Sequence, residues 1–456
     1  MSRILKHLTD AILIVSGALF LYLIINGRFD FEAVIYPYIH QYLPLKSVIT
    51  LLLVCPIVVF WVYLTERNIS KHEILIIISW LVLGFIVQIY LRNLSPYSFS
   101  QIITSDTSNS FYSPTLIYSL KEFLSKAVAD VSVLPPHVRT NMAGKVIFFY
   151  LLKALTVNPE IMGYLIVFFS NIGGIFVYFI SKYIFNSKLT ALYSLVLYLF
   201  FPAKIIFFPI LNTVSPVFTL ICFFLMLEYV IHHRDIFLLL LGIFSYILFI
   251  FEPTPLISGI IFLAILVKYI YEKQINSWQC LKLVVLPTLV FVAMHFYLEL
   301  VFGYSALNQF IYTFTDAVNY TVRTNKNYSE WVVQNLKEFL VGGGLTQSIL
   351  FIGGLIILIR KLLKHFIIES NKKVKFIMEP GPLMSFSLVI LILTLDLSGV
   401  IQGEALRFWI FIMVFLQIIA AYICAFEKRR STFYIILISN LFQTAVSIAM
   451  VSFVTP

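Results

Sequence analysis

The stretch EILIIISWLVLGFIVQIYL, residues 73–91, carries a charge only at its first position. A helix needs about 20 mostly apolar residues to cross the hydrocarbon core of a membrane, because each residue rises only about 1.5 Å. The stretch therefore predicts a transmembrane helix. Across the 456 residues, 60% are hydrophobic and 12% are charged, and that charged share is about half the value for a soluble domain. We therefore predict an all-α, polytopic membrane protein, and the composition excludes a cytosolic enzyme or a secreted domain.

The same test of length and hydropathy predicts thirteen transmembrane segments. They lie at residues 10–27, 47–65, 73–91, 161–181, 189–207, 212–231, 236–252, 254–270, 281–302, 345–363, 379–396, 406–425 and 432–452. Residues 145–157 are apolar but too short to cross, and they contain two lysines. We expect this segment to be an interfacial helix that lies on the membrane surface.

The distribution of Lys and Arg predicts how the chain is oriented. With a cytoplasmic N-terminus, the basic runs at 360–375 and 427–430 fall in short cytoplasmic loops, as the positive-inside rule requires. This bias explains the net charge of +10 without a nucleic-acid partner. We expect a multi-pass protein of the plasma membrane with three polar extracytoplasmic segments, 28–46, 92–160 and 303–344. The second is the longest, and long connections are usually functional.

Asp106 is the only acid in SQIITSDTSNSFYSP, residues 100–114, directly after the third predicted span. A carboxylate at the membrane boundary can act as a general base or bind a metal ion. The alternative is an ordinary solvated aspartate in a turn, which neighbouring Ser and Thr residues favour.

Two cationic candidates lie further along the chain, one in the same loop and one near the C-terminus. Arg139 follows His137 in LPPHVRTNMAGK, residues 134–145, and a guanidinium matches the geometry of phosphate oxygens. The alternative for Arg139 is contact with bulk lipid phosphate. Glu404 and Arg407 in GEALRFW, residues 403–409, share a helix face because they are three residues apart. They form either a phosphate site or an ion pair that anchors a helix end, with Trp409 in the interfacial belt.

Lys204 and Glu252 stand beside prolines at predicted outer helix ends, in FFPAKIIFFP and FEPTP. An ionisable residue near a membrane segment is costly unless it faces protein or a water-filled cavity. The pattern favours a role at a helix end for both, and the wall of such a cavity is the alternative.

The order of these segments resembles that of a known family. A span is followed by SDTSNSFYSP and then by LPPHVRTNMAGKVIFFYLLKAL, after which a series of apolar spans begins. This layout resembles the N-terminal half of the GT-C integral-membrane glycosyltransferases, in particular the protein mannosyltransferase and aminoarabinose transferase group. The resemblance covers about residues 73–270. Residues 1–72 would then be two added spans, and 271–456 a C-terminal transmembrane half.

The resemblance implies a polyprenyl-phosphate-linked sugar donor, a glycan, lipid or protein acceptor, and catalysis on the extracytoplasmic face. It assigns the catalytic base to Asp106. Arg407, Arg139 and Lys204 would bind the donor phosphate, with Glu404, His137 and Glu252 in support. Many family members carry adjacent acids, whereas Thr107 follows Asp106, which favours a single base and leaves a divalent metal ion an open possibility. Two other classes remain: a lipid-linked-saccharide flippase or multi-span transporter, and a polysaccharide polymerase or ligase.

Overall fold

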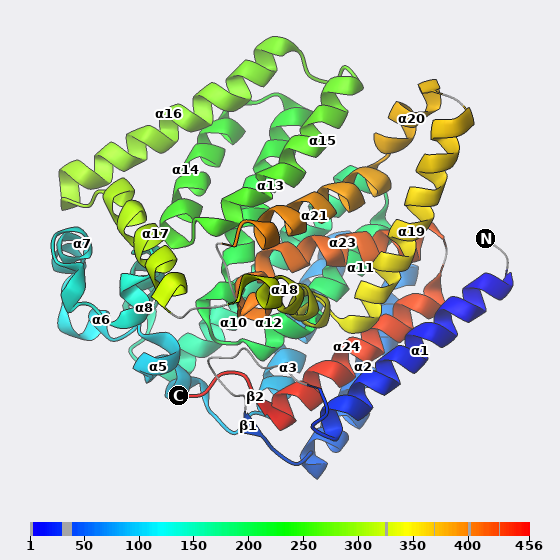
Figure 1. Ribbon diagram of the computed structural model, residues 1–456, viewed down its shortest axis with the longest axis horizontal. Helices are drawn as coiled ribbons and strands as arrows, with labels where there is room; N and C mark the ends of the chain where they lie inside the picture. Colours follow the sequence, from blue (N-terminus) through cyan, green and yellow to red (C-terminus); the bar gives the residue numbers. More distant parts are fainter. Residues whose placement is uncertain (1–2, 30–38, 324–326, 369, 400–402, 428) are drawn as a thin grey trace.

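The computed structural model of the protein describes residues 3–29, 39–323, 327–368, 370–399, 403–427 and 429–456. Part of the predicted outer segment 28–46 lies outside this description. Helices form nearly all of the described chain (Figure 1). The N-terminal helices are α1 Arg3–Ile25, α2 Leu45–Asn68, α3 Glu73–Arg92, α4 Phe99–Thr104, α5 Asp106–Asn109, α6 Pro114–Ile117, α7 Leu120–Ala129, α8 Pro136–Arg139, α9 Gly144–Leu155, α10 Pro159–Phe185, α11 Lys188–Phe200, α12 Pro202–Ile206, α13 Ser215–His232, α14 Asp235–Phe251 and α15 Gly259–Tyr271.

The remaining elements complete the bundle. The C-terminal helices are α16 Ser277–Phe302, α17 Ala306–Arg323, α18 Tyr328–Gly342, α19 Leu345–Ile368, α20 Ser370–Ile377, α21 Pro380–Leu397, α22 Ala405–Phe408, α23 Ile410–Phe426 and α24 Arg430–Met450. Three 3₁₀ helices are η1 Val131–Val133, η2 Leu211–Thr213 and η3 Thr254–Ser258. The short strands β1 Ile39–His40 and β2 Val451–Ser452 pair antiparallel.

The all-α, multi-pass prediction is confirmed. In the described part of the chain, eleven helical segments are long and apolar enough to cross a membrane. The other two predicted spans coincide with α14 and α23, each 17 residues long, which is about the lower limit for crossing. The 189–207 span is interrupted between α11 and α12, where Pro202 begins the second helix. The segment predicted to lie on the membrane forms α9, whose 12 residues are too few to cross.

The bundle has a buried centre and a peripheral helix. α11 packs between α10 and α23, and the candidate span of residues 188–206 is 94% buried. By contrast, α16 has no buried residue and packs mainly on α14 at the edge of the bundle (Figure 1). A helix that is apolar all round but not covered by protein is suited to contact with lipid.

The residues of 92–160 form a compact cap with its own apolar core. Phe123, Val146 and Phe149 are buried in one cluster with Leu211 and Phe251, which come from η2 and α14. Figure 1 shows α5 to α8 together at one end of the bundle, and α20 at the opposite end. The cap therefore sits on the ends of transmembrane helices and fixes its polar residues relative to them.

The contact between the cap and α14 can be tested at Gly144. A Cβ atom there would lie 2.5 Å from the backbone oxygen of Ile250 and 2.6 Å from Cα of Phe251, so backbone would have to move. We predict that Gly144→Ala lowers the free energy of unfolding by about 1–3 kcal/mol, the usual cost of overpacking. The change would appear as a lower Tm of the purified protein.

Gly353→Ala is the matched control, because Gly353 also lies in a helix but its Cβ would meet no atom within 4 Å. This control should keep the wild-type Tm or raise it slightly, since alanine favours the helix. Equal Tm values for the two variants would contradict the close packing of α9 on α14.

Candidate functional site

Asp106 begins the single-turn helix α5 and its side chain is exposed. The turn is set by Ser105, whose Oγ accepts hydrogen bonds from the backbone N–H groups of Thr107 (3.2 Å) and Ser108 (3.3 Å). No described residue forms a hydrogen bond or ion pair with the Asp106 carboxylate. Asp106 therefore lies in a capped turn, which was the alternative predicted from the sequence. The same turn leaves its carboxylate accessible to a reacting group.

His137 joins the two polar segments of the cap. Its Nε2 atom lies 2.8 Å from the backbone oxygen of Thr107, the residue after Asp106. Because a carbonyl only accepts hydrogen bonds, Nε2 donates, and in the neutral ring Nδ1 keeps a lone pair. Burial lowers the pKa of His137, the bond to Thr107 opposes this shift, and the positive charge of Arg407 lowers the pKa further. The ring therefore stays neutral at neutral pH.

A buried ion pair connects the cap to the transmembrane bundle. Lys145 Nζ lies 3.5 Å from Glu252 Oε2, and both side chains are almost fully buried. The remaining groups are also satisfied: Lys145 donates to Asn141 Oδ1 (3.1 Å), and Glu252 accepts from Asn212 (2.9 Å) and from Ser215. Burial lowers the pKa of Lys145, the Glu252 carboxylate opposes that shift, and the charge of Arg407 adds to it.

The second outer segment is tied to the same turn of the cap. Gln309 at the start of α17 accepts a hydrogen bond from the backbone N–H of Ala143 (3.0 Å) and another from the Tyr304 hydroxyl. Its amide donates to the backbone oxygen of Asn141 (3.3 Å). The turn that precedes Lys145 is therefore held from two sides.

The GEALRFW segment is positioned by α18. The buried Glu338 carboxylate accepts from the backbone N–H of Leu406 (3.0 Å), and Asn335 accepts from the N–H of Gly403 (3.2 Å). Gly403 has a φ of 96°, and a Cβ atom there would lie 2.5 Å from the ring of Trp331. Only glycine suits that position. Burial raises the pKa of Glu338, and its hydrogen bonds to Leu406 and Gln334 oppose the shift.

Arg407 and Glu404 form the ion pair that their spacing predicted. Both side chains are about one quarter exposed, and Glu404 has a φ of 57°, a left-handed conformation that costs about 1 kcal/mol or more outside glycine. The Nε atom of Arg407 is buried without a hydrogen-bond partner among the described residues. The helix-end alternative holds in part, because the pair does stand at the start of α22.

Electrostatic effects link the cap to the GEALRFW segment. The charges of Arg407 and Glu404 both act on His137, and the charge of Arg407 also acts on Lys145. The packing of the helices is consistent with this. The 3₁₀ helix η2 packs on both α13 and α23, and α23 follows α22, the helix of Arg407, directly in the chain. His137 and Lys145 therefore both lie within electrostatic range of Arg407, and Asp106 is connected to them through the bond from His137 to the Thr107 backbone.

Sequence reasoning missed Lys145 as a member of this region. In the sequence it is one of two lysines in a segment too short to cross the membrane. A signal was present, because Phe148, Phe149 and Leu152 lie three, four and seven residues further along and are buried on the same helix face. A lysine on the apolar face of an amphipathic helix requires a buried partner.

The other two cationic predictions are not joined to Arg407 by any hydrogen bond or ion pair in the described residues. Arg139 is half-buried on α8, two residues beyond His137. Lys204 is fully buried inside the bundle, where it donates to Asn171 Oδ1 (2.8 Å) and lies 3.9 Å from the centre of the Tyr198 ring. Asn171 donates in turn to Gln88 (2.7 Å). The assignment of Lys204 to a donor phosphate stays a prediction.

A protein-built metal site does not fit the described residues. None of them form a group of three or more His, Cys, Asp or Glu side chains close enough to hold a metal ion. Asp106 contributes one carboxylate, and Glu252 and Glu404 are already paired with cations. We therefore assign no step to a metal ion.

Comparison with known proteins adds no family assignment: no protein-family model matches the sequence, and neither does any curated protein.

The Lys145–Glu252 pair can be tested by removing one charge. We predict that Lys145→Met lowers the free energy of unfolding by about 3–5 kcal/mol, because Glu252 is left buried without its cation. In Lys145→Met/Glu252→Gln, no unpaired charge remains and the glutamine can still bond Asn212 and Ser215. This double variant should recover much of the Tm, and a double variant as unstable as the single one would contradict the pairing.

The protonation of His137 gives a pH test. Its folded pKa lies below the unfolded value of about 6.5, so its stabilising contribution is complete above that pH and is lost as the pH falls below it. Wild type should therefore lose more Tm on acidification than His137→Gln, which can still donate to Thr107. Parallel loss in the two proteins would show that His137 is not shifted.

Proposed function

We propose that the chain is an integral-membrane glycosyltransferase that moves a sugar from a polyprenyl-phosphate carrier to an acceptor hydroxyl on the extracytoplasmic face. The observation that supports this most is that His137 links the turn of Asp106 to the charge of Arg407. His137 bonds the backbone beside Asp106, and the charge of Arg407 acts on that same histidine. A sugar phosphate requires both kinds of group, one to accept a proton and one to stabilise a leaving anion.

The proposed reaction is a single displacement with inversion. The acceptor oxygen attacks the anomeric carbon while Asp106 takes the hydroxyl proton. The bond between that carbon and the phosphate oxygen breaks, and the polyprenyl phosphate leaves with the electron pair. An exposed Asp106 suits this role because the acceptor must reach it from outside the membrane. A general base contributes about 10²–10⁴-fold to such a rate.

Arg407 is the proposed donor-phosphate ligand. It stands at the start of α22, beside the apolar α23, so a phosphate here would be at membrane level and its prenyl chain could lie against the bundle. Its Nε donor is buried and its Nη2 pairs with Glu404, so Nη1 is the nitrogen proposed to meet a phosphate oxygen. Lys145 supplies a second positive charge nearby, although its direct contacts are to Glu252 and Asn141.

Transport of a lipid-linked saccharide is the second candidate, and Lys204 is the observation that favours it. Lys204, Asn171 and Gln88 form a buried polar chain across α12, α10 and α3. Ionisable residues inside a membrane bundle often mark a transport path. Loss of transport in Lys204→Met with intact sugar transfer in Asp106→Asn would support this class instead.

The role of Asp106 is tested by Asp106→Asn. Transfer of sugar from a polyprenyl-phosphate donor in reconstituted vesicles should fall about 10³-fold, because the amide cannot take the proton. Asp130→Asn is the matched control, since Asp130 is an exposed aspartate of the same cap whose carboxylate accepts a hydrogen bond from Ser132, and an asparagine oxygen can accept the same bond. Activity in Asp106→Asn equal to that of the control would remove Asp106 from the reaction.

The role of Arg407 is tested by separating donor from acceptor dependence. Arg407→Gln should raise the KM for the donor about tenfold or more, because a hydrogen bond to a charged group is worth about 1.5–3 kcal/mol. The KM for the acceptor should stay near its wild-type value. An equal rise in both KM values would indicate that the substitution disturbs the cap rather than the donor phosphate.

A further inference from the structure

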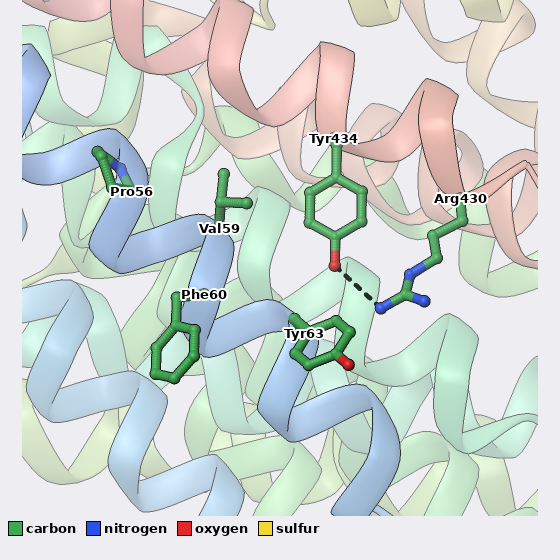
Figure 2. Close-up of a pocket in the computed structure, with 6 residues that line it drawn as sticks. All are labelled: Pro56, Val59, Phe60, Tyr63, Arg430 and Tyr434. Carbon is green, nitrogen blue, oxygen red and sulfur yellow. Dashed lines mark hydrogen bonds between the residues drawn. The ribbon is translucent and has the colours of Figure 1, made fainter.

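A groove of about 470 Å³ opens between α2 and α24, away from the residues discussed above. It is lined by Pro56, Val59, Phe60 and Tyr63 of α2 and by Arg430 and Tyr434 of α24 (Figure 2). Figure 2 shows the apolar side chains along α2 and the guanidinium at one end of the groove. From Pro56 to Tyr63 the groove follows α2 for about 10 Å, at 1.5 Å per residue.

The groove lies on a face that the bundle does not cover. Leu52, Leu53, Ile57 and Phe60 are exposed on this part of α2, within a candidate transmembrane span. In a membrane such a face contacts lipid chains. A soluble ligand or a polar peptide would find no matching chemistry along this wall, whereas an acyl chain would.

At the polar end of the groove, the guanidinium of Arg430 has nitrogens without a hydrogen-bond partner among the described residues. Arg430 Nη2 lies 2.5 Å from Glu66 Oε2 and donates to the Tyr434 hydroxyl (3.3 Å), while Nε and Nη1 have no partner among the described residues. The guanidinium lies 5.2 Å from the centre of the Tyr63 ring, and Arg67 stacks on that ring at 4.1 Å. Arg67 and Arg430 thus lie on the same tyrosine ring, and the Arg430 side chain is about half exposed.

We propose that this groove binds an anionic glycerophospholipid, with its phosphate on Nη1 of Arg430 and one acyl chain along Pro56, Val59 and Phe60. Glu66 holds the guanidinium in place through Nη2, so Nη1 is presented to the headgroup in a fixed orientation. The two tyrosines stand at the level between headgroup and chain, which is where tyrosine is enriched in membrane proteins. The site lies at the end of the bundle that bears the basic loops, and anionic lipids gather beside such loops.

The test is a titration of the delipidated full-length protein in detergent with phosphatidylglycerol, followed by native mass spectrometry. Arg430→Gln should weaken the first binding step about tenfold, as expected for loss of a charged hydrogen bond. Arg360→Gln is the matched control, because Arg360 is an exposed arginine in α19 that does not line the groove, and it should bind like wild type. Equal weakening in both variants would overturn the site in favour of general surface charge.

Two further variants keep the test independent of folding. Arg430→Lys retains the charge facing Glu66 but has no separate Nη1 nitrogen for the phosphate, so binding should fall between wild type and Arg430→Gln. Val59→Trp fills the groove without changing any charge and should also weaken binding about tenfold. Undiminished binding in Val59→Trp, or equal affinity for phosphatidylcholine, would overturn the proposal, as would competition by soluble glycerol phosphate.

Discussion

The buried ion pair of Lys145 and Glu252 is the contact on which the arrangement of the cap depends. Two charges out of water are costly, and their attraction repays that cost only when the remaining hydrogen bonds are also satisfied. Asn141, Asn212 and Ser215 supply those bonds. Because the partners come from the cap, from the 3₁₀ helix before α13 and from the end of α14, the network admits one placement of the cap. The position of the polar residues of the cap relative to the bundle therefore depends on this buried ion pair.

Arg407 is positioned by hydrogen bonds to the backbone of its own segment. No carboxylate of the cap bonds it directly, and its segment is instead held through its backbone by Asn335 and Glu338 of α18. The strained conformation of Glu404 persists because these bonds determine the path of the chain on both sides of it. Strain of this kind recurs at functional sites, where a side chain must be held in one orientation. The position of Arg407 thus rests on a helix that precedes it by more than sixty residues.

The transmembrane helices could be predicted from sequence because hydropathy and length are local properties. The predicted spans 73–91 and 281–302 coincide with α3 and α16 to within a few residues. The site could be predicted only in part. Residue type and spacing were enough for Glu404 and Arg407, whereas the Lys145–Glu252 pair joins residues more than one hundred positions apart. Glu338 and Asn335 gave no local signal, because their function is to bond backbone groups of a distant segment.

The exposure of α16 has a consequence for work with the purified protein. The main protein contact of α16 is with α14. In a membrane, lipid would cover the other sides of this helix. Regions with few buried contacts open before the rest of a structure. Since α17 follows α16 directly and carries Gln309, partial detachment of this corner in a harsh micelle would loosen the turn before Lys145 while the centre around α11 stays folded. A sample can thus keep its helical spectrum and still lose the geometry of its outer face.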